Sequence, residues 1–281
     1  MSTIGSTRRR RASRPDGPAP ADHRAEAALI RELWGRQREA DGSLSDDERR
    51  YLDAHFSMPL TLRRRLAMVD WLAAGIRPGD RVLEWGCRHG VDSCIYRRRF
   101  GPSLELHGCD FVEADDYRPF FEYSGLRYTR LVDYVRLDYP DASFDVVTSN
   151  GVWEHVFHEE ASLREVFRIL RPGGSFLVAC LPNRYSYTEA VQRKLGHSAH
   201  DRLYTIDSAT ALLNTTGFEV LAWERRLLLP TMLNGFPKPL KAAYSKLHGL
   251  VWAFNAALER TWPVGLLASN LNLVARRPAE G

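Results

Sequence analysis

The chain has 281 residues, of which 44% are hydrophobic and 26% charged, a composition typical of a soluble globular protein. Its net charge of +4 owes much to the arginines at positions 8–11 and 14, so the remainder offers no strongly basic surface for nucleic acid. No apolar run approaches the ~18 residues of a membrane-spanning helix, and the four cysteines contain no C-x-x-C pair, which favours a reducing, cytoplasmic setting.

The first part of the chain divides into a tail and a helical cap. Residues 1–24 are rich in arginine and proline and have little to bury, so we expect a disordered tail. Residues 25–78 predict three amphipathic helices that form an N-terminal cap. Apolar residues at helical spacing indicate the first, a capping box of Ser45 and Glu48 begins the second, and Pro59 begins the third.

Residues 79–230 alternate apolar strands with helical periods, which predicts a parallel α/β sheet covered by helices on both faces. The expected strands span residues 81–85, 104–109, 126–131, 144–149 and 174–181, and the expected helices span 90–100, 112–124 and 157–170. A further strand follows at 219–229. A helical insertion at 231–267 then precedes the final strand, which lies within 268–281.

The segment from Arg81 to Gly90 joins an apolar strand to a turn that has a carboxylate, Glu84, before it. Gly86 allows the backbone to turn where a β-carbon would clash, and Gly90 opens the next helix. The N–H groups at that helix start would face a ligand. A dinucleotide fingerprint would place glycine where this chain has Arg88, so the turn favours a different cofactor.

Four further motifs follow this turn in a fixed order: Leu106-His-Gly-Cys-Asp110, Val132-Asp133, Ser143-Phe-Asp-Val-Val-Thr-Ser-Asn-Gly-Val-Trp-Glu-His155 and Ile169-Leu-Arg-Pro-Gly-Gly-Ser-Phe-Leu-Val178. With these motifs the sequence resembles the class I S-adenosylmethionine-dependent methyltransferases, in particular their ubiquinone-type, small-molecule branch, over about residues 80–218. The resemblance implies a Rossmann-like doubly wound sheet, mostly parallel with an antiparallel edge strand. It also implies S-adenosyl-L-methionine as the cofactor.

The resemblance places this cofactor at the carboxyl ends of the strands. Asp110 would accept hydrogen bonds from the ribose hydroxyls, Glu84 would orient the methionine ammonium, and Asp133 would accept from the adenine amino group. The rings of Phe111 and Tyr134 would lie against the adenine. The expected cofactor-binding set is Glu84, Gly86, Gly90, Asp110, Phe111, Asp133, Tyr134, Asn150 and Gly151.

We expect methyl transfer to a small-molecule, lipid or sugar-type acceptor, most readily at oxygen. Two catalytic candidates stand in the motif that ends at His155: His155 would take a proton from a hydroxyl, and Trp153 would contact the sulfonium or flank the acceptor. No metal is expected, because His197 and His200 show no third ligand. The segment that borders the acceptor in the family supplies the expected acceptor residues Tyr185, Tyr187, His200, Arg202 and Tyr204.

Alternatives remain open at this point. A degenerate domain of the same fold would serve as a binding or interaction module, and a nicotinamide-dependent oxidoreductase is disfavoured by Arg88 and by the lack of a Tyr-x-x-x-Lys hydride site. Methylation of RNA or protein is disfavoured because residues 149–152 lack the family's Asn/Asp-Pro-Pro-Tyr/Phe motif. The insertion at 231–267 is expected to be a lid over the acceptor, with peripheral membrane contact as the alternative.

Overall fold

The computed structural model describes residues 21–39, 44–196, 200–231, 237–259 and 261–279. Most of the expected disordered tail, His197 and part of the expected lid therefore lie outside the described residues. Residues 23 and 24 begin the first helix, so the cap starts slightly earlier than expected. None of the helices in the described ranges combines the length and apolar character needed to cross a membrane.

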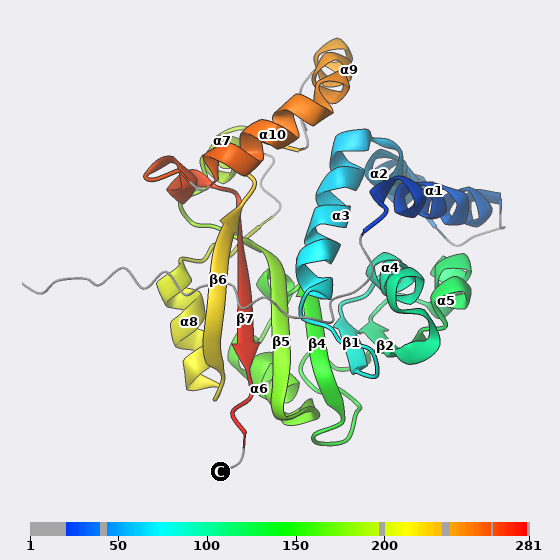
Figure 1. Cartoon of the computed structure of the whole chain (residues 1–281), viewed down its shortest axis with the longest axis vertical. Coiled ribbons are helices and arrows are strands. Elements are labelled where there is room, and N and C mark those ends of the chain that lie inside the picture. The colour runs from blue at the N-terminus through cyan, green and yellow to red at the C-terminus, as the bar shows by residue number, and fades with distance from the viewer. Residues whose placement is uncertain (1–20, 40–43, 197–199, 232–236, 260, 280–281) are drawn as a thin grey trace, which may run out of the picture.

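Within these ranges seven strands form one sheet in the order β3-β2-β1-β4-β5-β7-β6 (Figure 1). The strands are β1 Arg81–Trp85, β2 Glu105–Asp110, β3 Arg127–Arg130, β4 Phe144–Asn150, β5 Leu170–Pro182, β6 Glu219–Arg226 and β7 Asn270–Arg276. Strands β1 to β5 pair in parallel, whereas β7 runs antiparallel to both of its neighbours. The expected α/β fold with a mostly parallel sheet is therefore confirmed, and β7 lies one place inside the edge that β6 forms.

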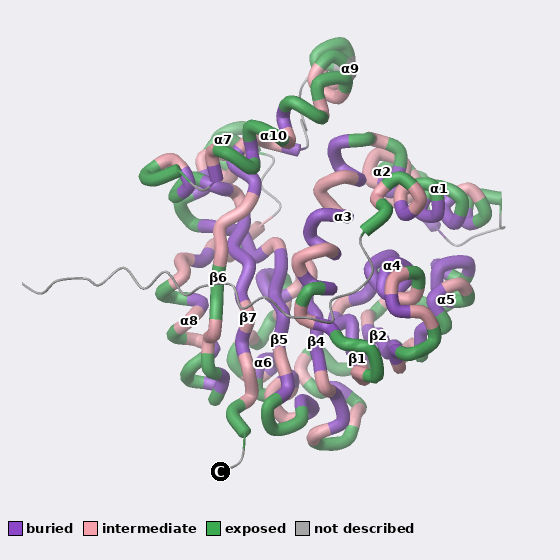
Figure 2. Tube along the Cα trace, in the orientation of Figure 1, coloured by how far each residue is buried: buried purple, intermediate pink, exposed green. Residues whose placement is uncertain are grey.

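Helices cover both faces of the sheet (Figure 1). They are α1 His23–Glu39, α2 Asp46–Ser57, α3 Pro59–Ala73, α4 Val91–Phe100, α5 Arg118–Ser124, α6 Glu159–Ile169, α7 Tyr187–Lys194, α8 Ile206–Thr215, α9 Lys238–Lys246 and α10 His248–Leu258. Because successive strand residues point to opposite faces, Val82 packs into a core with α1 to α5 and Leu83 into a second core with α6 and α8. Figure 2 shows β4, β5 and β7 as largely buried, whereas β6 at the edge of the sheet is exposed or half-buried along its length.

Several element boundaries differ from the sequence prediction, and two of the differences have a clear cause. The expected helix 112–124 is a 3-10 turn at Ala114–Tyr117 followed by the short α5, because Pro119 in the first turn of α5 begins a new helix. Strand β5 begins at Leu170 rather than at 174. Leu170 already pairs with Phe144, and a bulge then precedes the regular pairing of the two strands.

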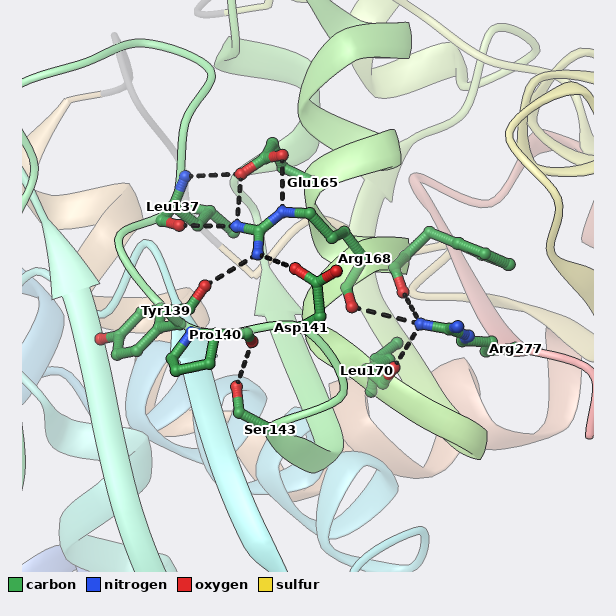
Figure 3. Close-up of polar contacts among 10 residues, drawn as sticks. Leu137, Tyr139, Pro140, Asp141, Ser143, Glu165, Arg168, Leu170 and Arg277 are labelled. Atoms are coloured by element: carbon green, nitrogen blue, oxygen red, sulfur yellow. Dashed lines mark hydrogen bonds and ion pairs between the residues drawn. The ribbon is translucent and has the colours of Figure 1, made fainter.

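Arg168 of α6 fixes the long loop that follows β3 (Figure 3). Its guanidinium donates to the backbone carbonyls of Leu137 and Tyr139, each at 2.8 Å. It also pairs with the carboxylates of Asp141 at 2.7 Å and Glu165 at 2.8 Å. Glu165 in turn accepts from the Leu137 amide at 3.0 Å. The loop thus returns to the sheet from a position that α6 determines.

Candidate active site

The turn between β1 and α4 depends on two glycines in the left-handed region. Gly86 has a φ of +72°, and a β-carbon there would lie 2.5 Å from Val152. Gly90 has a φ of +65°, and a β-carbon there would lie 2.9 Å from the ring of Phe121. Side chains would therefore be strained at both positions and would also collide with neighbours. The contact at Gly86 shows that this turn packs directly against the segment that follows β4.

Glu84 is buried and faces the first turn of α4. Its Oε2 accepts hydrogen bonds from the Ser93 amide at 3.0 Å and the Ser93 hydroxyl at 2.5 Å, so it satisfies an N–H that the helix leaves unpaired. Burial, followed by the negative charge of Asp92, raises the pKa of Glu84 to about 8. The carboxyl group that was expected to meet the ligand thus makes its contacts within the turn.

Asp110, at the end of β2, also stabilises the turn. Its Oδ2 accepts from the Arg88 amide and its Oδ1 from the Phe111 amide, each at 2.7 Å. Arg88 has a φ of +41°, and its guanidinium lies 2.7 Å from Glu48 of α2, which also accepts from the Tyr117 hydroxyl. The cap helix α2 is therefore tied to the turn through the side chain that replaces a glycine.

The region expected to receive an adenine is formed by exposed groups. The ring centroids of Phe111 and Tyr134 lie 5.2 Å apart, and Phe157 adds a third ring 5.0 Å from Tyr134. A base held between Phe111 and Tyr134 would need a separation of roughly 7 Å, twice an ordinary contact distance. Asp133 accepts from the amides of residues 135 and 136 at 2.7 and 2.8 Å, and these hydrogen bonds lower its pKa.

A cleft of about 630 Å³ opens beside the turn, between the cap and the ends of β4, β5 and β6. Side chains from α2, α3, α7 and residues 227–231 line it, together with residues 150–155 and the end of β5. In β5, Cys180 has a φ of +63° beside a shift in the pairing with β7, and its amide donates to Asn272 Oδ1 at 3.1 Å. This bulge turns the strand where it borders the cleft.

The structure brings five of the expected site residues to this cleft: Asn150, Gly151, His155, Tyr187 and His200. Asn150 and Gly151 connect it to the glycine turn, because the next residue, Val152, packs on Gly86. Among the described residues, the expected ones that lie outside its lining are Glu84, Gly86, Gly90, Asp110, Phe111, Asp133, Tyr134, Trp153, Tyr185, Arg202 and Tyr204.

Some of these side chains are buried in the core or make contacts outside the cleft. Trp153 is fully buried in the core to which α6 and α8 contribute, and its ring lies 5.3 Å from that of Tyr204. Arg202 donates to the backbone carbonyls of Val156 and Phe157, and Tyr185 is 55% exposed. The structure therefore places neither Trp153 nor Tyr204 where it would meet a molecule in the cleft.

A buried charge network, which sequence reasoning did not find, joins the turn, the cap and the cleft. Arg65 of α3 pairs with the buried carboxylate of Asp92, and the Asn150 amide donates to the same carboxylate at 2.7 Å. Arg65 also lies 3.3 Å from His89, whose pKa burial and then the charge of Arg65 lower well below its ordinary value. Asp92, two residues after Gly90, was the available sequence signal. Arg65 belongs to no short motif.

A second polar set lies on the wall of the cleft. Glu154 is buried, and its Oε1 lies 3.8 Å from His155 Nε2 and 4.0 Å from His200 Nε2. His200 Nδ1 lies 2.9 Å from Glu189 of α7. Burial raises the pKa of Glu154 to about 7 and lowers the pKa of His155, whereas the hydrogen bond with Glu189 raises that of His200. These side chains can therefore accept a proton from a molecule bound in the cleft or donate one to it.

Comparison with known proteins identifies the protein family to which the chain belongs. Residues 57–222 match a model described as a methyltransferase domain. A probable S-adenosylmethionine-dependent methyltransferase of Mycolicibacterium smegmatis is 35% identical over 144 residues, which cover 50% of this chain and 53% of that protein. The sterol 24-C-methyltransferase of Eremothecium gossypii is 29% identical over 176 residues, covering 54% and 44% of the two proteins. The chain spans about half the length of the curated relatives it matches.

A likeness of fold extends over more of the chain. A chain in the solved complex of the Haloferax volcanii Trm112 methyltransferase activator with a methyltransferase has a TM-score of 0.56 at 17% identity. The match covers 92% of this chain and 99% of that one. It therefore includes the cap and the strands that follow the matched domain.

Proposed function

Because the chain belongs to the class I S-adenosylmethionine-dependent methyltransferases, we propose that it methylates a small-molecule acceptor of lipid or sugar type at oxygen, within the cleft. One observation carries this proposal. The cleft of about 630 Å³ reaches the glycine turn at Asn150 and Gly151, so a molecule in the cleft would meet a cofactor on the turn at one point. Membership of this family also removes the basis for the nicotinamide-dependent alternative.

The donor chemistry of the turn fits S-adenosylmethionine in most respects. Asp110 presents a partly exposed carboxylate at the end of β2, where two vicinal hydroxyls would find acceptors. Asp133 uses Oδ1 for its two backbone hydrogen bonds, and Oδ2 would accept from an amino group. The contact between Phe111 and Tyr134 fits less well, and an adenine would have to stack on one ring or separate them.

Arg65 and Asn150 would hold the methionine end of the cofactor. Both contact Asp92 behind the turn, and both line the cleft. The guanidinium supplies a cation for a carboxylate, and Asp92 supplies an anion for an ammonium group. When bound, the cofactor supplies an electrophilic methyl group on a sulfonium sulfur. The chain has to align an acceptor atom with that group and exclude water from both.

The lining of the cleft favours an acceptor with an apolar body and a hydroxyl. Leu227, Leu229 and Pro230 provide an apolar side, while Glu154 and His155 form a polar wall. The imidazole of His155 would take the hydroxyl proton as the acceptor oxygen forms its bond to carbon. The relative named as a sterol 24-C-methyltransferase acts on a lipid, which agrees with a lipid-type acceptor here.

The segment after β6 would act as a lid on this cleft. The hydroxyl of Tyr244 in α9 donates to the carbonyl of Pro230 at 2.7 Å, next to the apolar lining. Trp252 of α10 lies under the guanidinium of Arg63, 5.3 Å away, and so α10 contacts α3. In Figure 1 α10 and α3 rise above the same end of the sheet. These contacts favour a lid over the alternative of a membrane surface.

The test is direct. The purified chain should bind S-adenosylmethionine and transfer its labelled methyl group to a hydroxylated lipid or isoprenoid extracted from cells that lack the protein. Mass spectrometry should find in those cells an intermediate lighter by one methylene, and fragmentation should place the added methyl group on oxygen. Failure to bind the cofactor would overturn the function, while methylation at carbon or nitrogen would overturn the assignment to oxygen.

A second candidate function is favoured by one observation. Arg88, Val152 and the contact between Phe111 and Tyr134 fill parts of the turn that a cofactor would use. A methyltransferase fold closed in this way would act as a binding module without catalysis. Titration with S-adenosylmethionine separates the two candidates, because only the enzyme requires saturable binding.

A further inference from the structure

We propose that Glu154, His155 and His200 bind a divalent transition-metal cation of the Zn²⁺ type on the wall of the cleft. One carboxylate oxygen and two imidazole nitrogens of these residues lie within 4.8 Å of one another. Zinc bonds of ~2.0–2.1 Å in a tetrahedral site separate the ligand atoms by about 3.4 Å. The separations of 3.8 and 4.0 Å between Glu154 Oε1 and the Nε2 atoms of the two histidines need only small side-chain rotations to reach that value.

The carboxylate of Glu154 provides a second, independent observation. Its side chain is 2% exposed, and Oε2 has no hydrogen-bond partner among the described residues. A buried carboxylate oxygen without a partner is costly, and a coordinated cation removes that cost. A cation between Glu154 and the histidines would therefore give this oxygen the partner it lacks among the described residues.

His200 is held as a ligand would be. Its Nδ1 lies 2.9 Å from Glu189 Oε1, so the carboxylate of α7 orients the imidazole and directs Nε2 toward Glu154. That Nε2 is the atom that lies 4.0 Å from Glu154. Metal-bound histidines commonly have such a carboxylate behind them. The set therefore includes three ligands and one supporting acid from three separate segments.

The donor set indicates the kind of cation. Two imidazoles and one carboxylate suit Zn²⁺ and its transition-metal neighbours, whereas Mg²⁺ prefers oxygen ligands. Three protein ligands leave at least one position open, and His155, which is 53% exposed, places that position toward the cleft. This inference rests on the proposed function in one respect: an acceptor hydroxyl in the open position would lose its proton more readily. His155 would then serve as a ligand rather than as a base.

The experiment uses the full chain after removal of bound metal. Zn²⁺ is titrated against a chromophoric chelator, and Co²⁺ is added separately to record its visible absorption. We expect one equivalent to bind. Glu154→Gln and His200→Gln should weaken Zn²⁺ binding by at least about 100-fold, and Glu189→Gln by about 10- to 100-fold through loss of support for His200.

Two variants serve as controls. His158→Gln removes an exposed histidine that stands three residues from His155 and outside the set, and its affinity for Zn²⁺ should equal that of the wild type. Cys180→Ser removes the thiol that borders the cleft, and unchanged binding there excludes a thiolate ligand. If Glu154→Gln does not fold, His200→Gln and His155→Gln provide the same comparison, with the melting temperature of each metal-free variant recorded first.

Absence of stoichiometric Zn²⁺ and Co²⁺ binding would overturn the inference, as would equal affinity in the wild type and His200→Gln. Mg²⁺ binding of equal strength would overturn the assignment to a Zn²⁺-type cation. S-adenosylmethionine is titrated into the same metal-free samples. Cofactor binding without metal binding removes only this inference, whereas metal binding without cofactor binding removes the proposed function and leaves the metal site established.

Discussion

The two halves of the sheet edge that carries the site differ in how they satisfy their polar groups. At the ends of β1 and β2 the acids are already paired: Glu84 with Ser93, and Asp110 with the amides of Arg88 and Phe111. Beyond β4, the cleft wall contains Glu154 with an unpartnered oxygen beside two histidines. We call the ends of β1 and β2 with their turn the closed half, because its acids already have hydrogen-bond partners. We call the cleft wall beyond β4 the open half, because it still has polar atoms that can bind a ligand.

This difference indicates which part of the site can change when the acceptor changes. The closed half is built from contacts of the β1–α4 turn with the ends of β1 and β2, so the hydrogen bonds of its acids shape the turn. The open half is assembled from the cap, α7 and the ends of three strands, which lie far apart in the sequence. A change of acceptor would then require changes in the open half alone.

Substitution of Glu84 tests whether burial disfavours the ionised form of this carboxyl group in the closed half. Its pKa rises from an ordinary 4.5 to about 8 in the folded protein, so below pH 4.5 both states are protonated. Between pH 4.5 and 8 only the folded state retains the proton, and the wild type loses stability as the pH rises. Glu84→Gln should remove this loss and be more stable than the wild type at pH 8, by on the order of 3 kcal/mol.

Urea denaturation of both proteins at pH 5 and pH 8 measures this difference. The other ionisable groups are common to the two proteins, so the difference between the two pH profiles isolates Glu84. Parallel profiles would show that Glu84 is ionised in the folded protein. The closed half would then hold a buried negative charge.

Asp110→Ala tests whether the closed half also binds the cofactor. Loss of two charge-assisted hydrogen bonds to ribose hydroxyls, at ~1.5 kcal/mol each, would weaken S-adenosylmethionine binding by on the order of 100-fold. Isothermal titration calorimetry gives the affinity. Asp133→Ala is the comparison and should have a smaller effect, because Asp133 is exposed and bonded to the amides of its own loop. Unchanged affinity in Asp110→Ala would place the cofactor elsewhere.

Much of the closed half could be predicted from the sequence because its signals are local. Apolar runs ended by Glu84 and Asp110 gave strands β1 and β2, and the turn between β1 and α4 followed from Gly86 and Gly90. The same local signals were available for two helices that we did not predict. Ser186 caps α7, and Thr205 begins α8 with a reciprocal capping box.

The open half could not be predicted in the same way. Its chemistry depends on contacts between distant segments, such as Asn150 with Asp92 and His200 with Glu154. The sequence indicates His155 and His200 as separate candidates, but no spacing in it places them on one wall of the cleft. For Trp153 the local signal was misleading. Its motif predicts a site residue, but the side chain is buried in the core, where it packs against Tyr204.

Asn255→Ala tests whether the lid belongs to the open half. This buried residue of α10 accepts from the Leu229 amide at 2.6 Å and donates to the Leu229 carbonyl at 3.3 Å. Its removal leaves the partly buried N–H of Leu229 unpaired and should cost about 2 kcal/mol. Acceptor KM should rise while the affinity for S-adenosylmethionine stays constant. The exposed neighbour Phe254→Ala should change stability by less than ~0.5 kcal/mol, and an equal loss in both variants would contradict the assignment.

Substitution of Arg88 has the smallest expected effect on stability. It tests whether the backbone strain at this residue matters, because Arg88 joins the turn of the closed half to the cap. Its φ of +41° costs a non-glycine residue about 1 kcal/mol, while its half-exposed ion pair with Glu48 contributes ~0–1 kcal/mol. Arg88→Gly removes both and should leave stability within ~0.5 kcal/mol of the wild type. Arg88→Ala loses the ion pair but keeps the strain, so it should be about 1 kcal/mol less stable than Arg88→Gly. If thermal denaturation shows the alanine variant to be as stable as the glycine variant, the turn is not strained. The closed half would then owe its geometry at residue 88 to the cap rather than to its own backbone.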